Sequence, residues 1–120
     1  MGDYYWVIIV VFVVGVFAIK RMGMVGRTEA RRLMEAGAKV IDVRSQGEFS
    51  TGHCAGATNI PLNAITERIE REVADKETPI LLYCLSGTRS GAAARLLRGQ
   101  GYTQVHNLGS LGRAKRIVGK

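Results

Sequence analysis

The sequence predicts an α/β domain in which helices cover both faces of a parallel sheet. Two short apolar stretches, at 39–43 and 79–83, have the length and composition of buried strands, and a third strand is expected at 103–107 after Gly101. Runs with apolar side chains at helical spacing lie between the strands, at 62–74 and 89–99. Buried apolar strands that alternate with amphipathic helices are typical of parallel sheets. At 120 residues, the chain has room for one small domain and a short appendage.

The appendage is an uninterrupted apolar segment near the N-terminus. Residues Tyr4 to Ile19 include no charged side chain, and aromatic residues cluster at their start. As a helix, the segment spans about 24 Å at ~1.5 Å per residue, slightly less than the ~30 Å hydrocarbon core of a bilayer. It is too long for a strand of a small domain, and it lacks the basic start and cleavage site of a signal peptide. We therefore predict one transmembrane helix.

Charge predicts how this segment is oriented. The net charge is +7, and Asp3 is the only charged side chain before Lys20. Basic residues favour the cytoplasmic side, so we expect a single-pass membrane protein whose folded domain faces the cytoplasm, with membrane lipid contacting residues 4–21. The predicted organisation is a transmembrane anchor at 1–21, a short basic linker at 22–27 and the folded domain at 28–120.

The remaining elements follow from local sequence. Thr28 is suited to cap a helix over 29–36, and Gly37 is suited to end it. Polar residues at 46–51 predict a short helical turn, and 59–60 predict a brief extended piece before Pro61. The chain ends in an amphipathic stretch at 111–118.

Composition argues against several functions. The basic excess is not accompanied by a nucleic-acid-binding motif or by interleaved aromatic residues, so no nucleic-acid partner is predicted. His53 and His106 stand alone, so no metal site is predicted. Cys54 lies among small apolar residues, which favours a packing role over a redox role. A disulfide between Cys54 and Cys84 is not expected, because it would block Cys84, the better nucleophile of the two.

Residues 84–90, Cys-Leu-Ser-Gly-Thr-Arg-Ser, are the strongest functional signal. A predicted strand leads into them and a predicted helix leads out, so Cys84 lies where a strand ends and a helix begins. Backbone N–H groups at a helix start attract anions, and the same field lowers the pKa of a thiol. Ligands of parallel sheets bind at the carboxyl ends of the strands. We therefore predict that Cys84 is a nucleophile in an anion-binding loop.

Together with three other blocks, this loop resembles the rhodanese family. Residues 40–44, 48–49 and 52–61 are similar to the family pattern D-x-R…E-[FY]…G-H-I-x-G-A-x-N-I-P, and 84–90 are similar to the family's active-site loop. The resemblance covers residues 28–110 or so. It implies a small rhodanese-like domain and a thiosulfate sulfurtransferase-like enzyme. No cofactor is implied beyond a covalent persulfide intermediate on Cys84.

The resemblance also implies a reaction and its partners. Cys84 would accept a sulfane sulfur from a small anionic donor such as thiosulfate and pass it to a thiol, to cyanide or to a protein cysteine. We expect loop N–H groups and the hydroxyls of Ser86 and Thr88 to hold the anionic sulfur. Arg89 would bind a sulfonate-like group, because its fork matches paired oxygens, although a local ion pair is the alternative. The expected substrate-binding residues are Leu85, Ser86, Gly87, Thr88, Arg89 and Ser90.

Four further residues match family positions: Asp42, Arg44, Glu48 and His53. Asp42 ends a predicted strand, and Arg44 and Glu48 are spaced for an ion pair across a turn. His53 is expected to hydrogen-bond within its loop rather than to act as a base. We expect these residues to support the fold, and a place in the pocket stays open for each. The stretch 109–113 departs from the family, because it lacks the paired glycines and the tryptophan that many members carry there.

Other readings of the loop are possible on sequence grounds. Phosphatases with a Cys-x5-Arg loop cradle a phosphoryl group, but the spacing from Cys84 to Arg89 is Cys-x4-Arg, and a smaller cradle suits one extra sulfur better. A membrane-tethered module acting as a redox or persulfide sensor, or as an interaction adaptor, would retain the fold without turnover. The presence of both Cys84 and Arg89 favours catalysis.

Overall fold

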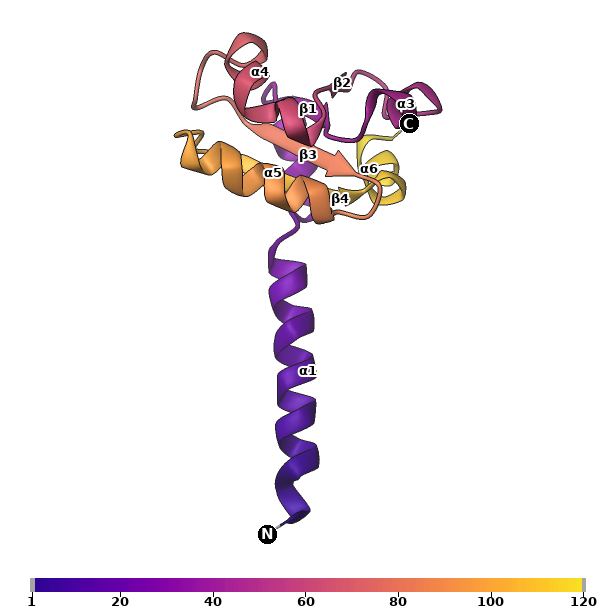
Figure 1. The fold of residues 1–120 in the computed structure, drawn as a ribbon, viewed down its shortest axis with the longest axis vertical. Helices are drawn as coiled ribbons and strands as arrows, with labels where there is room; N and C mark the ends of the chain where they lie inside the picture. The colour runs from indigo at the N-terminus through magenta and orange to yellow at the C-terminus, as the bar shows by residue number, and fades with distance from the viewer. Residues whose placement is uncertain (1, 120) are drawn as a thin grey trace.

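The computed structural model describes the backbone of residues 2–119 and the side chains of residues 3–15 and 23–119. A four-stranded sheet forms the centre of the domain (Figure 1), with all neighbouring strands parallel and in the order β2-β1-β3-β4. The strands are β1 (Lys39–Asp42), β2 (Thr58–Asn59), β3 (Ile80–Cys84) and β4 (Val105–Ser110).

Helices cover both faces of this sheet, as the sequence predicts. Buried side chains of α4 (Ile65–Glu72) and α5 (Thr88–Gly99) pack on one face. Those of α2 (Arg27–Glu35) and α6 (Leu111–Val118) pack on the other. The remaining helices are η1 (Gly2–Tyr4), α1 (Tyr5–Met22), α3 (Gln46–Ser50) and η2 (Leu62–Ala64).

The central strand β3 places the cysteine. Every residue of β3 is buried, and its side chains alternate between the two faces. Ile80, Leu82 and Cys84 join the core beneath α4 and α5, whereas Leu81 and Tyr83 join the core beneath α2 and α6. Cys84 therefore lies at the carboxyl end of the sheet, on the face that α5 covers.

Some predicted boundaries differ from the structure. Thr28 is not the N-cap of its helix, because the helix begins at Arg27 and Gly26 precedes it without a side-chain cap. The helix predicted at 62–74 begins as the 3-10 turn η2 before α4. The strand predicted at 103–107 is displaced towards Ser110, because β4 stays paired with β3 as far as Cys84.

Helix α1 projects away from the domain (Figure 1). Large apolar side chains from Tyr4 to Val14 are exposed along it. Among the residues that the structure describes, however, no helix has both the length and the apolar character needed to cross a bilayer. The predicted transmembrane helix is therefore not supported, and the side chains of its residues 16–21 lie outside the described residues.

Candidate active site

The sulfur of Cys84 is held by the loop that follows it. Its side chain has no exposed surface. The backbone N–H groups of Gly87 and Ser90 donate to Sγ over 3.0 Å and 3.4 Å. The Ser90 hydroxyl oxygen lies 3.5 Å from the same sulfur. Because α5 begins at Thr88, these N–H groups belong to the start of a helix, where backbone donors lack partners within the helix.

The tight turn of this loop depends on two glycines. Gly87 adopts a φ of +97°, and a Cβ atom there would lie 3.3 Å from Cα of Gly109 on β4. Gly109 itself has a φ of +91°. A side chain at Gly87 would therefore be strained and would also push against the backbone of β4.

This environment lowers the pKa of the Cys84 thiol. Burial raises that pKa, but hydrogen bonds from the Ser90 hydroxyl and from the N–H groups of Ser90, Gly87 and Ser86 outweigh the effect of burial. The pKa of the Cys54 thiol is instead raised, mainly because that thiol is buried. Of the two cysteines, Cys84 is the one that the structure prepares as a thiolate.

The guanidinium of Arg89 is occupied by Glu48. Two nitrogens of Arg89 donate to the two carboxylate oxygens of Glu48, over 2.7 Å and 3.0 Å. Glu48 also forms a capping box with Ser45 at the start of α3. The hydrogen bonds from Arg89 and Ser45 lower the pKa of Glu48 to about 2. The local ion pair that was the alternative for Arg89 is thus the arrangement that forms.

A second ion pair lies beneath the loop that follows β1. Asp42 and Arg44 are buried and joined by several hydrogen bonds, the shortest of which is 2.7 Å. Arg44 also donates to the carbonyl oxygen of Gly52 over 2.6 Å. The predicted pair between Arg44 and Glu48 is therefore wrong. Asp42 lies within hydrogen-bonding distance of the buried Arg44 guanidinium. Glu48, on α3, bonds to Arg89 instead.

His53 and Cys54 have the surroundings that the sequence favours. Nδ1 of His53 lies 2.9 Å from the carbonyl oxygen of Phe49, and the two rings stack with centroids 3.6 Å apart. Cys54 is buried in the core beneath α2 and α6, and neither cysteine is in a disulfide. His53 thus ties its loop to the end of α3.

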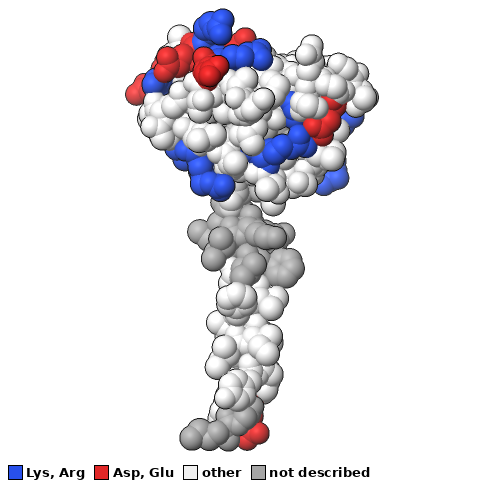
Figure 2. Space-filling view, viewed as in Figure 1, with Lys and Arg blue, Asp and Glu red and all other residues white. Residues whose placement is uncertain are grey.

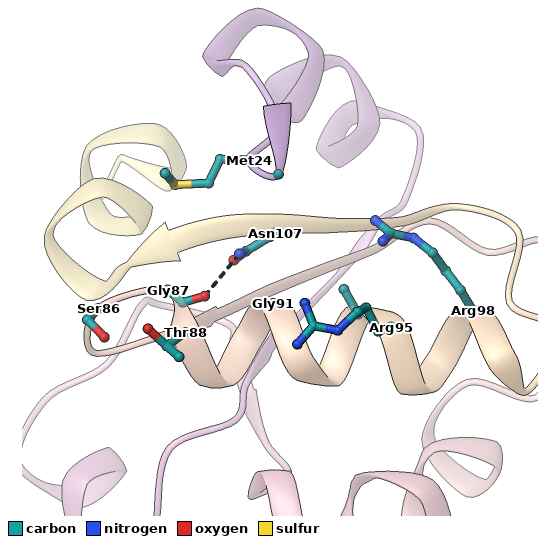
Figure 3. Close-up of a pocket in the computed structure, with 10 residues that line it drawn as sticks. Met24, Ser86, Gly87, Thr88, Gly91, Arg95, Arg98 and Asn107 are labelled. Atoms are coloured by element: carbon teal, nitrogen blue, oxygen red, sulfur yellow. Dashed lines mark hydrogen bonds between the residues drawn. The ribbon is translucent and has the colours of Figure 1, made fainter. Parts of the chain in front are cut away.

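Two pockets border the loop. One, of about 400 Å³, is lined at the carboxyl ends of β1 and β2 by Val43, Ser45, Pro61, Leu62, Asn63 and Arg89. The other, of about 510 Å³, lies between α5 and β4 (Figure 3). Ser86, Gly87 and Thr88 line this second pocket beside Arg95, Arg98, Asn107 and Met24. Within the described residues, no cluster of His, Cys, Asp or Glu is arranged to hold a metal ion.

Of the predicted loop residues, Ser86, Gly87 and Ser90 hydrogen-bond to the sulfur. Neither the Ser86 nor the Thr88 hydroxyl is among the described hydrogen-bond donors to Sγ, and the hydroxyl that contacts the sulfur is that of Ser90. Leu85 is exposed next to the buried cysteine. Sequence reasoning also missed Asn107, which bonds to Gly87 and Ser90. Asn107 is the last residue of a predicted strand, 103–107, that is already largely polar, so the sequence carries no local signal of this role.

Comparison with known proteins identifies the family. The model of the rhodanese-like domain matches residues 27–111. The chain belongs to the rhodanese family. This membership confirms the predicted rhodanese-like α/β fold, and the expected kinship with thiosulfate sulfurtransferases is confirmed by the relatives described next.

Relatives in bacteria share the rhodanese region. Thiosulfate sulfurtransferase PspE of Escherichia coli is 44% identical over 71 residues, which are 59% of this chain and 68% of PspE. The uncharacterized protein YqhL of Bacillus subtilis is 46% identical over 71 residues. That match spans 59% of this chain and only 55% of YqhL.

Solved rhodanese structures superpose on the domain. A rhodanese with anions from E. coli has 40% sequence identity and a TM-score of 0.63, over 64% of this chain and 91% of the other. The human single-domain sulfurtransferase TSTD1 has 28% identity and a TM-score of 0.61, over 75% of this chain and 89% of the other. The chain is thus an enzyme of the rhodanese type.

The lowered pKa of Cys84 is testable without any substrate. The ultraviolet absorbance of the thiolate, taken as the difference between wild type and Cys84→Ser, should titrate with a midpoint below the ordinary thiol value of about 8.5. Ser90→Ala should move the midpoint upwards, because it removes a hydroxyl beside the sulfur. Cys54 is present in both proteins, so its absorbance cancels in the difference. A wild-type midpoint at or above the ordinary value would contradict the described environment.

Proposed function

We propose that this rhodanese transfers a sulfane sulfur from a small anionic donor such as thiosulfate, through a persulfide on Cys84, to a thiol, cyanide or protein-cysteine acceptor. The observation that carries the proposal is the convergence of the Gly87 and Ser90 N–H groups on Sγ. These donors stabilise a thiolate, which is the nucleophilic form of cysteine. A persulfide is also anionic at neutral pH, so the same loop suits the intermediate.

The chemistry needs no redox partner or metal. The thiolate of Cys84 attacks the outer sulfur of thiosulfate, a new S–S bond forms to Sγ, and the S–S bond of thiosulfate breaks. Sulfite leaves with the electron pair. The acceptor, for example the carbon of cyanide, then attacks the terminal sulfur of the persulfide. The Sγ–S bond breaks, thiocyanate leaves, and the thiolate of Cys84 is regenerated.

The pocket at Arg89 is the site that we assign to the donor. It opens at the carboxyl ends of the strands and combines apolar walls from Val43, Pro61 and Leu62 with the guanidinium of Arg89. Because Glu48 holds both outer nitrogens of that guanidinium, a sulfonate must compete with Glu48 for the fork. Arg89 therefore contributes to donor binding by exchanging partners.

The persulfide cycle is tested by intact-mass measurement. Incubation with thiosulfate should add the mass of one sulfur atom at Cys84, and cyanide should remove it and release thiocyanate. Cys84→Ser should abolish both steps, whereas Cys54→Ser should leave them intact. The proposal would be overturned if the folded protein, with Cys84 reduced, took up no sulfur from thiosulfate or from an organic persulfide. That result would favour the sensor or adaptor role.

Competition at Arg89 gives a separate prediction. Glu48→Gln should lower the apparent KM for thiosulfate by roughly two- to five-fold, since it weakens a part-exposed ion pair and removes a negative charge beside the donor. Arg89→Ala should raise that KM, and a neutral persulfide donor should respond less to either change. Glu72→Gln removes an exposed carboxylate of α4 and serves as the matched control. Equal responses of charged and neutral donors would contradict the role of Arg89.

We propose in addition that α1 attaches the domain to a lipid membrane. The support is the row of exposed apolar side chains from Tyr4 to Val14, with Tyr4, Tyr5 and Trp6 at one end as in an interfacial aromatic belt. Figure 2 adds basic side chains on the part of the domain that flanks the junction with α1, where they suit anionic headgroups. The cytoplasmic orientation stays a prediction from the sequence.

Flotation with vesicles tests this attachment. The full chain should rise with vesicles of phosphatidylcholine and phosphatidylglycerol. A variant with Val10→Glu and Phe12→Glu should remain at the bottom of the gradient while retaining sulfur transfer, because the changes lie outside the rhodanese domain. Flotation of both proteins, or of neither, would show that α1 is not a lipid attachment.

A further inference from the structure

Asn107 is the one buried amide beside the active loop. It lies on β4 and is 6% exposed. Its Oδ1 accepts the Ser90 hydroxyl over 2.7 Å and the Gly109 N–H over 2.8 Å. Its Nδ2 donates to the carbonyl oxygen of Gly87 over 3.1 Å, the contact drawn in Figure 3. Both the oxygen and the nitrogen of the amide are therefore hydrogen-bonded to protein groups.

Two of these partners are the residues that hold the sulfur. Gly87 and Ser90 donate their backbone N–H groups to Sγ of Cys84, and Asn107 bonds to Gly87 and Ser90 through other atoms. Asn107 comes from a different strand, far along the chain. The amide thus ties the two donor residues to the edge of the sheet rather than leaving them to the loop alone.

The Ser90 hydroxyl has one proton and several acceptors to choose from. Its oxygen lies 2.7 Å from Asn107 Oδ1, 3.1 Å from the Gly87 carbonyl oxygen and 3.5 Å from Sγ. The shortest contact is the one with Asn107, so the amide sets the direction of the hydroxyl. Without it, the Ser90 side chain loses its shortest hydrogen bond, and the backbone N–H of Ser90 is held less firmly on the sulfur.

An irregularity in β4 aims Asn107 at the loop. Leu82 of β3 pairs with Asn107, but Tyr83 pairs with Gly109, so Leu108 is an extra residue in the ladder. A bulge of this kind redirects a side chain, and the positive φ of Gly109 accompanies it. The backbone of Asn107 is fixed as well, because its carbonyl accepts the Val25 N–H over 2.9 Å.

We propose that Asn107 is a positioning residue for sulfur transfer, which holds Gly87 and Ser90 so that their N–H groups stay on the sulfur of Cys84. The inference rests on the proposed function for its role in the reaction, since the same donors would hold the persulfide. Its first consequence concerns the thiolate alone. That consequence can be measured in the absence of any donor.

The test compares two substitutions with a matched control. Asn107→Ala removes all three hydrogen bonds of the amide. Asn107→Leu keeps a branched side chain of similar shape but carries no charge and no hydrogen-bonding group. Tyr102 precedes β4, and its hydroxyl donates to the Val73 carbonyl oxygen over 2.6 Å. The control variant Tyr102→Phe removes this other buried hydrogen bond. Thermal unfolding measures how much stability each of the three variants loses, so that their titrations can be compared at similar losses.

The readout is the midpoint of the thiolate titration of Cys84. Both Asn107 variants should titrate about one pH unit above wild type, a roughly ten-fold loss of thiolate at a given pH below the midpoint. Tyr102→Phe should retain the wild-type midpoint. Wild-type midpoints in a folded Asn107 variant would overturn the proposal. Should Asn107→Ala unfold, the uncharged Asn107→Leu decides, and hydrogen exchange of the Gly87 and Ser90 amides in that variant should be faster than in Tyr102→Phe.

The experiment separates this inference from the proposed function. A shifted midpoint together with no persulfide in the wild type would remove the proposed reaction while leaving Asn107 as the residue that positions the loop. A normal persulfide cycle with unshifted midpoints would leave the reaction standing and remove Asn107 from it. A shifted midpoint together with slower sulfur uptake from thiosulfate in the Asn107 variants supports both.

Discussion

The structure around the active site depends on how the chain reverses direction immediately after Cys84. The sulfur is satisfied only if Gly87 and Ser90 turn their N–H groups back towards the end of β3. That turn requires a left-handed residue at Gly87 and a strand passing within van der Waals contact of it. Strand β4 can pass this close because Gly87 has no side chain to meet the backbone of Gly109.

Charge near the sulfur is arranged in two layers. The inner pair, Asp42 and Arg44, is buried and ties the end of β1 to the carbonyl of Gly52, so it fixes the backbone that surrounds the pocket. The outer pair, Glu48 and Arg89, is part-exposed and joins α3 to the start of α5. Buried pairs are costly to break, whereas part-exposed pairs exchange partners readily. The inner pair therefore suits scaffolding, and the outer pair suits ligand exchange.

Most of the fold was accessible from local sequence, because strands buried on both faces leave unmistakable apolar runs such as Ile80–Tyr83. The cysteine at the end of such a run was accessible for the same reason. The partner of Arg44 was not, since sequence spacing favoured Glu48 while burial at the end of β1 selected Asp42. Asn107 was hidden because its importance comes from a bulge and from contacts across the sheet, neither of which has a local signature. The anchor was inferred from an uncharged apolar run with aromatic residues at its start, and the described helix does not support a membrane span.

The complete burial of Cys84 limits which oxidants can reach its sulfur. A thiolate is the form of cysteine most readily oxidised to sulfenic and higher acids. Here the sulfur has no exposed surface, while its neighbour Leu85 is 56% exposed at the rim of the loop. Any reagent must first displace the atoms above the sulfur, so bulky oxidants are excluded by size.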